Sequence, residues 1–349
     1  MHQAFEVVPV VEDLPLKIEA VLAYSDRLYI GTSTGVLLVY EVRESTDEEP
    51  LSVTLIESKK NFSKKTIEQL EYIKEMDVLV SLSDNVVSMY DTQTLTLRPQ
   101  LPKIKNAYLF AVSSSIEIED GIPAIMTRLC VAVKKKLVIY SWEDMDLLDT
   151  KEFNVPDKVR KITWASSTKL CLSFTKGYVI LDLSTGKLTE LFVNAGEGTG
   201  LGSSLSELGS MAIGAMGMIL NAGKPLIVRL PNDELLVEKD NVSIFISPDG
   251  TPTRKAGISW SAAPEELGYS FPYAIAILSK HVEIRNIGTQ RLVQNIELMH
   301  AQMMTQGKVI YIASADHVWR LIPLDFMKQI DQLVESNEFE EALSLLDQI

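Results

Sequence analysis

The hydrophobic positions of the chain fall into short runs that come in pairs, and a polar turn separates the two runs of each pair. The first pair occupies residues 28–31 and 36–40, on either side of a turn at 32–35. Runs of four or five residues rich in Val, Ile and Leu, with turn residues between them, predict β-hairpins. Seven such pairs follow one another, and their second runs begin at Val36, Val86, Leu137, Tyr178, Val242, Val282 and Val318.

The spacing of these hairpins predicts the fold class. Successive second runs begin 36 to 64 residues apart, and several pairs have a further candidate strand before or after them. A propeller blade of four antiparallel strands takes about 40 to 50 residues. We therefore expect a mainly β protein in which residues 1–323 form a seven-bladed, WD40-like β-propeller. A β-sandwich followed by a second domain is the competing interpretation, because the intervals are irregular.

The first residues are expected to complete the last blade. The seventh hairpin ends near Pro323, which leaves its blade one strand short. The apolar run at 4–10 has no neighbouring partner in the sequence and is the candidate for the missing strand. Such a pairing would remove an open sheet edge, which is a site prone to aggregation.

Residues 324–349 have the periodicity of helices. Ile330, Leu333 and Val334 lie at i, i+3 and i+4, and the apolar residues of 343–346 form a second set. Two helices cannot bury both of their faces alone, and helical repeats need neighbours. We expect the first hairpin of a clathrin-repeat-like α-solenoid, truncated in this chain, which would then be the N-terminal part of a longer protein.

Composition narrows the class of protein. Apolar residues make up 46% of the chain and charged residues 23%, as in globular proteins with a buried core. The formal net charge of −14 argues against nucleic acid as a partner, because phosphate binding needs a basic face. There is no leader-like start and no apolar run long enough for a membrane span, and Cys130 and Cys171 both lie in apolar runs. We expect a cytoplasmic protein with reduced cysteines.

The sequence offers no candidate site for catalysis, a cofactor or a metal ion. The four histidines, His2, His281, His300 and His317, do not follow a metal-ligand spacing, and His281 and His317 fall in equivalent hairpin turns. No nucleophile elbow, phosphate-binding loop or kinase motif is present. We therefore expect a protein that is not an enzyme.

Residues 194–223 stand apart from the hairpin pattern. They contain eight glycines, some in alternation, but no strand and helix frame them as in a dinucleotide-binding fingerprint. The segment is interpreted as a Gly-rich insertion. Its apolar, Met-rich second half is predicted either to form the inner strand of the fifth blade or to contact a partner or a membrane.

Two basic segments interrupt the acidic sequence. Lysines in blade turns project outward, where an acidic partner or anionic lipid headgroups could meet them, although a charge run is more often only a solvated face. The candidate partner- or membrane-binding residues are Lys59, Lys60, Lys64, Lys65, Lys134, Lys135 and Lys136.

Several segments resemble the vacuolar protein sorting-associated protein 39 family. They are residues 1–6, 61–65, 130–137, 282–285, 318–323 and 329–343. The resemblance covers nearly the whole chain in order, but it does not extend to 194–223. The lysine-rich segments and the Met-His start favour this family over its paralogue, the transforming growth factor β receptor-associated protein of the early-endosomal CORVET complex.

The resemblance implies a citron-homology (CNH) β-propeller in a subunit of the HOPS tethering complex. Such a subunit promotes fusion of late endosomes and autophagosomes with the lysosome or vacuole. The implied partners are a membrane-resident Rab-family GTPase and other HOPS subunits, with peripheral association to these membranes. Two alternatives stay open: nucleotide exchange on Rag- or Rab-type GTPases in nutrient signalling, and a CORVET-type early-endosomal tether. No GTPase-contacting residue is carried over from the family to this sequence.

Overall fold

A computed structural model describes residues 1–44, 51–99, 101, 105–119, 122–175, 177–192, 225–239 and 241–348. The described residues form seven antiparallel sheets that belong to two compact units. The first unit comprises Met1–Asn106 and Pro264–Ile349, and the second comprises Ala107–Ala263. The Gly-rich insertion predicted at 194–223 lies outside the described residues. The two predictions for its second half, an inner strand of the fifth blade or a contact with a partner or a membrane, therefore concern residues that the structure does not describe.

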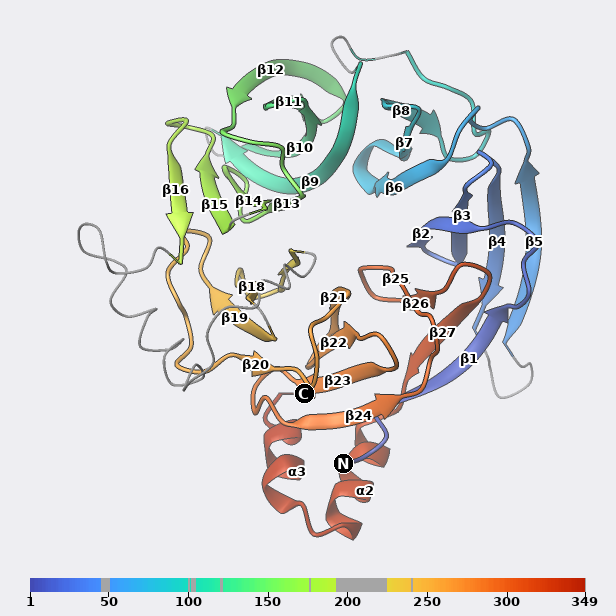
Figure 1. Cartoon of the computed structure of the whole chain (residues 1–349), viewed down its shortest axis with the longest axis vertical. Helices are drawn as coiled ribbons and strands as arrows, with labels where there is room; N and C mark the ends of the chain where they lie inside the picture. Colours follow the sequence, from blue (N-terminus) through green and yellow to red (C-terminus); the bar gives the residue numbers. More distant parts are fainter. Residues whose placement is uncertain are drawn as a thin grey trace. The chain divides into compact units, whose positions relative to one another are not determined.

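The first unit contains four sheets and the two helices (Figure 1). Its first two sheets are β2 (Ile18–Tyr24), β3 (Arg27–Thr32), β4 (Leu37–Arg43) and β5 (Ser52–Lys59), then β6 (Ile67–Ile73), β7 (Val78–Ser83) and β8 (Val86–Asp91), with the 3-10 turn η1 (Lys74–Met76) between β6 and β7. The other two sheets are β21 (Glu266–Ser270), β22 (Tyr273–Ile277), β23 (Val282–Asn286) and β24 (Leu292–Ile296), then β25 (Met303–Met304), β26 (Ile310–Ala313) and β27 (Val318–Pro323) with β1 (Phe5–Val11).

The second unit contains three sheets of four strands each. They are β9 (Ala107–Glu119), β10 (Ile122–Val133), β11 (Lys136–Glu143) and β12 (Asp146–Asn154); β13 (Lys161–Trp164), β14 (Lys169–Phe174), β15 (Gly177–Asp182) and β16 (Leu188–Leu191); and β17 (Ile227–Arg229), β18 (Leu235–Lys239), β19 (Val242–Ile246) and β20 (Ile258–Ser259).

The sheets are the blades of a seven-bladed β-propeller, which confirms the predicted fold class and excludes the β-sandwich. The strands of each blade follow one another along the chain, except that β1 joins β25–β27. Every predicted hairpin is formed by the second and third strands of a blade, and the residues of these strands are mostly buried on both faces. Near-continuous apolar runs are the pattern expected of strands that pack between neighbouring sheets.

The N-terminal strand completes the last sheet. β1 pairs antiparallel with β27, from Phe5 opposite Pro323 to Val11 opposite Val318, with a register shift after Pro9. The two strands lie side by side although they come from opposite ends of the chain (Figure 1). Phe5 is buried in the same core as Tyr273, and their rings meet edge to face at 5.8 Å.

Two helices follow β27 directly. α2 (Phe326–Glu335) begins after Asp325, whose carboxylate accepts hydrogen bonds from the backbone N–H groups of Met327 and Lys328. This N-cap satisfies donors that the first helical turn leaves unpaired. α3 (Phe339–Leu346) runs back alongside α2. The two helices bury apolar side chains in the core that the blade β21–β24 shares with the last sheet, namely Ile330, Leu333, Ala342 and Leu345.

Candidate interaction surface

The first lysine segment is the connection between β5 and β6, and a buried aromatic ring holds it in place. Phe62 is only 7% exposed, and its ring centroid lies 4.3 Å from that of Tyr90 in β8. Removing a phenylalanine ring from water contributes about 2–3 kcal/mol. The buried Phe62 ring therefore anchors the middle of the β5–β6 connection to the core.

Hydrogen bonds to backbone carbonyls fasten the same connection to the β3–β4 turn. The Ser63 N–H donates to the carbonyl of Gly35 at 3.0 Å, and the Thr66 hydroxyl donates to the carbonyl of Ser33 at 3.0 Å. Gly35 has a φ of +79°, and a Cβ at this position would overlap the carbonyl oxygen of Ser63. Only glycine satisfies both the backbone conformation and the close approach.

The four lysines of this segment differ in their surroundings. The half-buried Lys59 donates from its ammonium group to the carbonyl of Leu95. Lys65 forms an ion pair with Asp84 in the β7–β8 turn, and that hydrogen-bonded carboxylate raises the pKa of Lys65. Lys60 and Lys64 are exposed and form no ion pair within the described residues. Within the described residues, two of the four ammonium groups thus have no carboxylate partner.

The second lysine segment is the tight turn between β10 and β11 in the other unit. Lys135 lies 3.5 Å from the Asp157 carboxylate and also donates to the carbonyl of Pro156, while Lys136 lies 3.4 Å from Glu152. Lys134 is exposed and forms no ion pair among the described residues, and its φ of +54° places it in the left-handed region. Nearby carboxylates thus compensate two of the three charges.

The connection between β1 and β2 meets the β26–β27 turn in an exposed acidic cluster. The imidazole of His317 lies 2.9 Å from an Asp316 carboxylate oxygen and 3.7 Å from one of Asp13, and it stacks on Trp319 with centroids 5.6 Å apart. The hydrogen bond to Asp316 raises the pKa of His317. One ligand atom from each of Asp13, Asp316 and His317 lies within 4.8 Å of the others, a spacing that a metal ion could bridge, but exposed acidic groups commonly gather without one.

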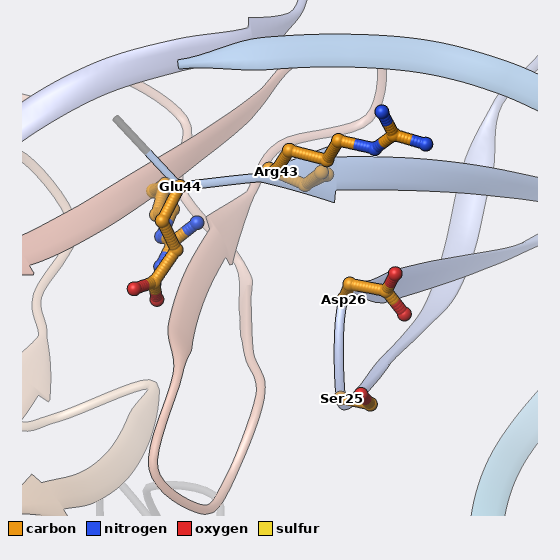
Figure 2. Close-up of a pocket in the computed structure, with 6 residues that line it drawn as sticks. Ser25, Asp26, Arg43 and Glu44 are labelled. Atoms are coloured by element: carbon orange, nitrogen blue, oxygen red, sulfur yellow. The ribbon is translucent and has the colours of Figure 1, made fainter. Parts of the chain in front are cut away.

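A pocket of about 330 Å³ lies where the β2–β3 turn, the end of β4 and Arg320 of β27 meet (Figure 2). Arg320 is 7% exposed, donates to the Glu44 carboxylate at 2.6 Å, and leaves its Nε without a partner among the described residues. Asp26 and Arg43 also line the pocket. Acidic and basic side chains are both present, so the lining does not select a ligand by charge.

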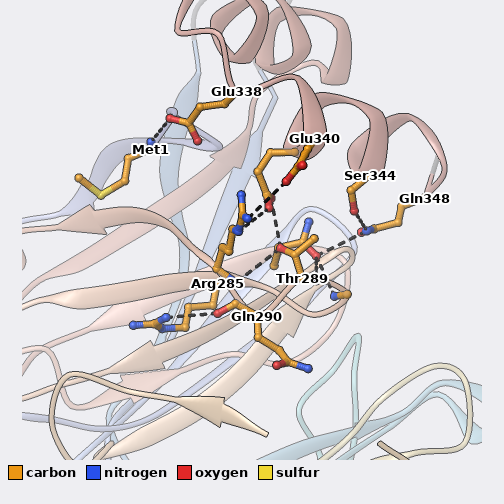
Figure 3. A network of polar contacts seen from close by, with 12 residues as sticks. Met1, Arg285, Thr289, Gln290, Glu338, Glu340, Ser344 and Gln348 are labelled. Carbon is orange, nitrogen blue, oxygen red and sulfur yellow. Dashed lines mark hydrogen bonds and ion pairs between the residues drawn. The ribbon is translucent and has the colours of Figure 1, made fainter. Parts of the chain in front are cut away.

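Polar contacts between residues far apart in the sequence bind the two helices to the blade β21–β24 and to the N-terminus. The N-terminal ammonium group lies 2.7 Å from the Glu338 carboxylate, and Gln329 accepts a hydrogen bond from the Tyr273 hydroxyl at 2.6 Å. Beside α3, Arg291 lies 3.3 Å from Glu341, and the Thr289 hydroxyl donates to Glu341 at 3.1 Å (Figure 3). The partners in each pair are far apart in the sequence, so no local sequence pattern predicts these contacts.

The helical hairpin also carries large apolar side chains that are exposed. The large exposed side chains of α2 and α3 are Met327, Val334, Phe339, Leu343 and Leu346. Neither helix in the described part of the chain has the length and hydropathy needed to span a bilayer.

Comparison with known proteins identifies the family. The profile of the CNH domain matches residues 24–307. The chain belongs to the CNH domain family. A solved structure, the AfRom2 CNH domain, superposes with a TM-score of 0.61 at 17% identity and covers 92% of this chain and 99% of its own, which supports the fold alone.

Relatives from several species have names that confirm the predicted resemblance to the vacuolar protein sorting-associated protein 39 family. The human Vam6/Vps39-like protein is 33% identical over 362 residues, and the Arabidopsis thaliana vacuolar sorting protein 39 is 28% identical over 353 residues. Both alignments include 99% of this chain. The chain spans only 38% and 32% of these two relatives, so it corresponds to one part of such proteins.

Proposed function

We propose that this CNH propeller is the N-terminal interaction module of a HOPS-type membrane-tethering subunit and that it binds a membrane-resident Rab GTPase. The observation that carries the proposal is the similarity to the Vam6/Vps39-like protein along 99% of this chain. In the proposed role the chain acts by binding rather than by catalysis. Its place would be the cytoplasmic side of late endosomes, lysosomes or the vacuole.

The first lysine segment is the proposed contact for the GTPase. Its connection is anchored by Phe62, while Lys60 and Lys64 present exposed ammonium groups. An anchored loop loses little conformational entropy on binding, and exposed charges raise the association rate with an acidic surface. The second segment is a weaker candidate, because Lys135 and Lys136 already face Asp157 and Glu152.

The helical hairpin is the proposed contact with the rest of the subunit or with other HOPS subunits. Among its exposed apolar side chains are Phe339, Leu343 and Leu346 of α3. Helical repeats bury such residues against the next repeat, because a single hairpin cannot cover both of its faces.

The test is binding of this chain to purified late-endosomal and early-secretory Rab GTPases, each loaded with a GTP analogue or with GDP, at low and high salt. We expect capture of one GTP-loaded Rab and weaker binding at high salt. Changing Lys60 and Lys64 together to Gln should lower the affinity about tenfold. The matched variant, with Lys135 and Lys136 changed to Gln, should have a smaller effect.

Two outcomes would contradict this proposal. Absence of binding to every Rab in both nucleotide states would place GTPase recognition outside this chain. Faster release of a fluorescent GDP analogue from a Rab or Rag GTPase would instead identify an exchange factor, which is the alternative function.

A further inference from the structure

The first blade of the second unit has unusually long inner strands whose shared end is apolar and exposed. β9 has 13 residues and β10 has 12, whereas the other strands of this unit have at most nine. Ile116 and Ile118 of β9 are 74% and 76% exposed. In the β9–β10 register they lie opposite Ile125 and Pro123, so one face of the hairpin end is apolar.

The end of the β11–β12 hairpin adds three exposed apolar side chains, Met145 in the turn and Leu147 and Leu148 near the start of β12. Met145 is 59% exposed, Leu147 45% and Leu148 54%. The turn is fastened to β10, because the backbone N–H of Asp144 donates to the Ile125 carbonyl at 2.8 Å and the Ile125 N–H donates to the Asp144 carboxylate at 3.3 Å.

Strand register places Leu147 on the same face of the sheet as the two isoleucines of β9. Leu147 lies opposite Trp142, Trp142 opposite Thr127, and Thr127 opposite Ser114 of β9. Side chains two residues apart on a strand share a face, so Ile116 and Ile118 follow Ser114 on the side to which Leu147 belongs. Leu147 and the two isoleucines therefore share a face, and the hydrogen bonds between Asp144 and Ile125, which lies opposite Ile116, hold the ends of the two hairpins together.

Clustering distinguishes these residues from ordinary surface. In the described part of the second unit, every large apolar side chain that is strongly exposed belongs to this set of five. Single exposed apolar residues are common, but a contiguous patch with a polar border is typical of an interaction site.

The border of the patch is acidic. Glu143, Asp144 and Asp146 form no ion pair within the described residues. The two nearby basic side chains have carboxylate partners: Arg128 donates to Glu117 at 2.6 Å, which lowers the pKa of Glu117, and Lys151 lies 3.6 Å from Asp149. This negative field repels an anionic lipid surface and attracts a basic partner.

We propose that this apolar–acidic surface, formed by Ile116, Ile118, Met145, Leu147 and Leu148 with Glu143, Asp144 and Asp146, binds an amphipathic basic helix of a partner protein. The partner's apolar side chains cover the isoleucines and Leu147, and its Lys or Arg side chains reach Asp144 and Asp146. An amphipathic helix supplies apolar and basic groups on adjacent faces, which suits an apolar surface with an acidic border.

The test uses the whole chain and a short fluorescent helical peptide of leucine and lysine, with all leucines on one face. Binding is followed by anisotropy at low and high salt, and a leucine–glutamate peptide and a scrambled leucine–lysine peptide serve as probes of charge and amphipathicity. We expect the segregated leucine–lysine peptide to bind best. Changing Ile116 and Ile118 together to Asn should raise its Kd at least about tenfold, because two buried isoleucines lose their contacts.

Matched variants separate this surface from the general acidity of the chain. Asp144→Asn with Asp146→Asn should weaken binding and reduce its salt dependence. Leu97→Asn, at an exposed leucine of the first unit, and Glu12→Gln with Asp13→Asn, at an exposed acidic pair, should leave the Kd unchanged. Circular dichroism melting of each variant checks that it is folded.

Three results would overturn the proposal. Equal binding of the leucine–lysine peptide to the wild type and to the Ile116/Ile118 variant would show that the patch is not its site. If the leucine–glutamate peptide bound as tightly as the leucine–lysine peptide, the partner would not need to be basic. Flotation of the chain on neutral phosphatidylcholine vesicles, lost in the same variant while no peptide binds, would make the surface a membrane contact instead.

Discussion

The two lysine segments look alike in the sequence but differ in the structure. The connection at 59–66 is long, has a buried ring at its centre, and leaves Lys60 and Lys64 without carboxylate partners in the described residues. The turn at 134–136 is short, and Asp157 and Glu152 compensate two of its three charges. A run of like charges therefore does not measure the charge available to a partner, because residues distant in the sequence decide how much of it remains uncompensated.

The largest effect on this comparison should come from Phe62→Ala. Loss of the ring from its contact with Tyr90 should lower the local stability of the blades β2–β5 and β6–β8 by about 3 kcal/mol. Hydrogen exchange of the backbone amides of these strands measures the change. The control is Leu55→Ala at an exposed position of β5, which should have a small effect. If Phe62→Ala had an equally small effect, the Phe62 ring would not anchor the connection.

Gly35→Ala should have the next largest effect, about 2 kcal/mol of local destabilisation, because it combines a left-handed backbone with an overlap on the Ser63 carbonyl. The change should also release residues 60–66, which hydrogen exchange detects as faster exchange of the Ser63 amide. Gly186→Ala is a suitable control, since its φ of +71° is similar but the nearest atom to a Cβ there is 3.9 Å away. If both variants lost the same stability, the effect of Gly35→Ala would come from backbone strain alone and not from the overlap with Ser63.

Lys134→Gly should stabilise the second segment slightly, by roughly 0.5–1 kcal/mol, because glycine adopts a positive φ without the steric cost that lysine incurs. A thermal melt of the variant tests this expectation. Lys135→Gly, at the neighbouring position of the turn, is the comparison, because positive φ is recorded for Lys134 and not for Lys135. A larger gain from Lys135→Gly would contradict the assignment of the strained position.

The smallest expected effect is electrostatic. Asp84→Asn should lower the pKa of Lys65 toward its ordinary value, as measured by NMR titration of the lysine side chain. The raised pKa means that the pair contributes stability below the unfolded-state pKa of lysine and loses it as the pH rises through the folded-state value. Both groups are exposed, so a thermal melt near neutral pH should hardly change. A Lys65 pKa that stays raised in the variant would show that Asp84 is not its cause.

Much of the fold could be predicted because its signals are local. Each hairpin repeats an apolar run, a turn and a second run within about 15 residues, and pairing of two runs within such a span follows from the turn between them. The seven hairpins, their spacing and the helical periodicity after Pro323 were sufficient for the propeller class. The resemblance to one family rested on short segments, and comparison with relatives confirms it.

The candidate surfaces could be predicted only in part. Lysine positions are visible in the sequence, but the pairing of Lys65 with Asp84 and of Lys135 with Asp157 depends on which turns meet at one end of adjacent strands. The exposed isoleucines of β9 also escape sequence analysis, because Ile116 and Ile118 continue the same strand as the buried Phe110. Apolar alternation identifies a strand, but not where along its length the neighbouring elements stop covering it.

The sequence by itself determined the hairpin repeat, the switch from strands to helices and the family of this chain, because these depend on contacts between near neighbours or on residue identity. Only the tertiary structure decided which lysine ammonium groups have a carboxylate partner among the described residues, which end of β9 and β10 is exposed, and how Gln329 and Glu338 bind the helices to Tyr273 and the N-terminus. Those features join groups that lie far apart along the chain, and their energies depend on distance and solvent exposure, which a linear pattern does not contain.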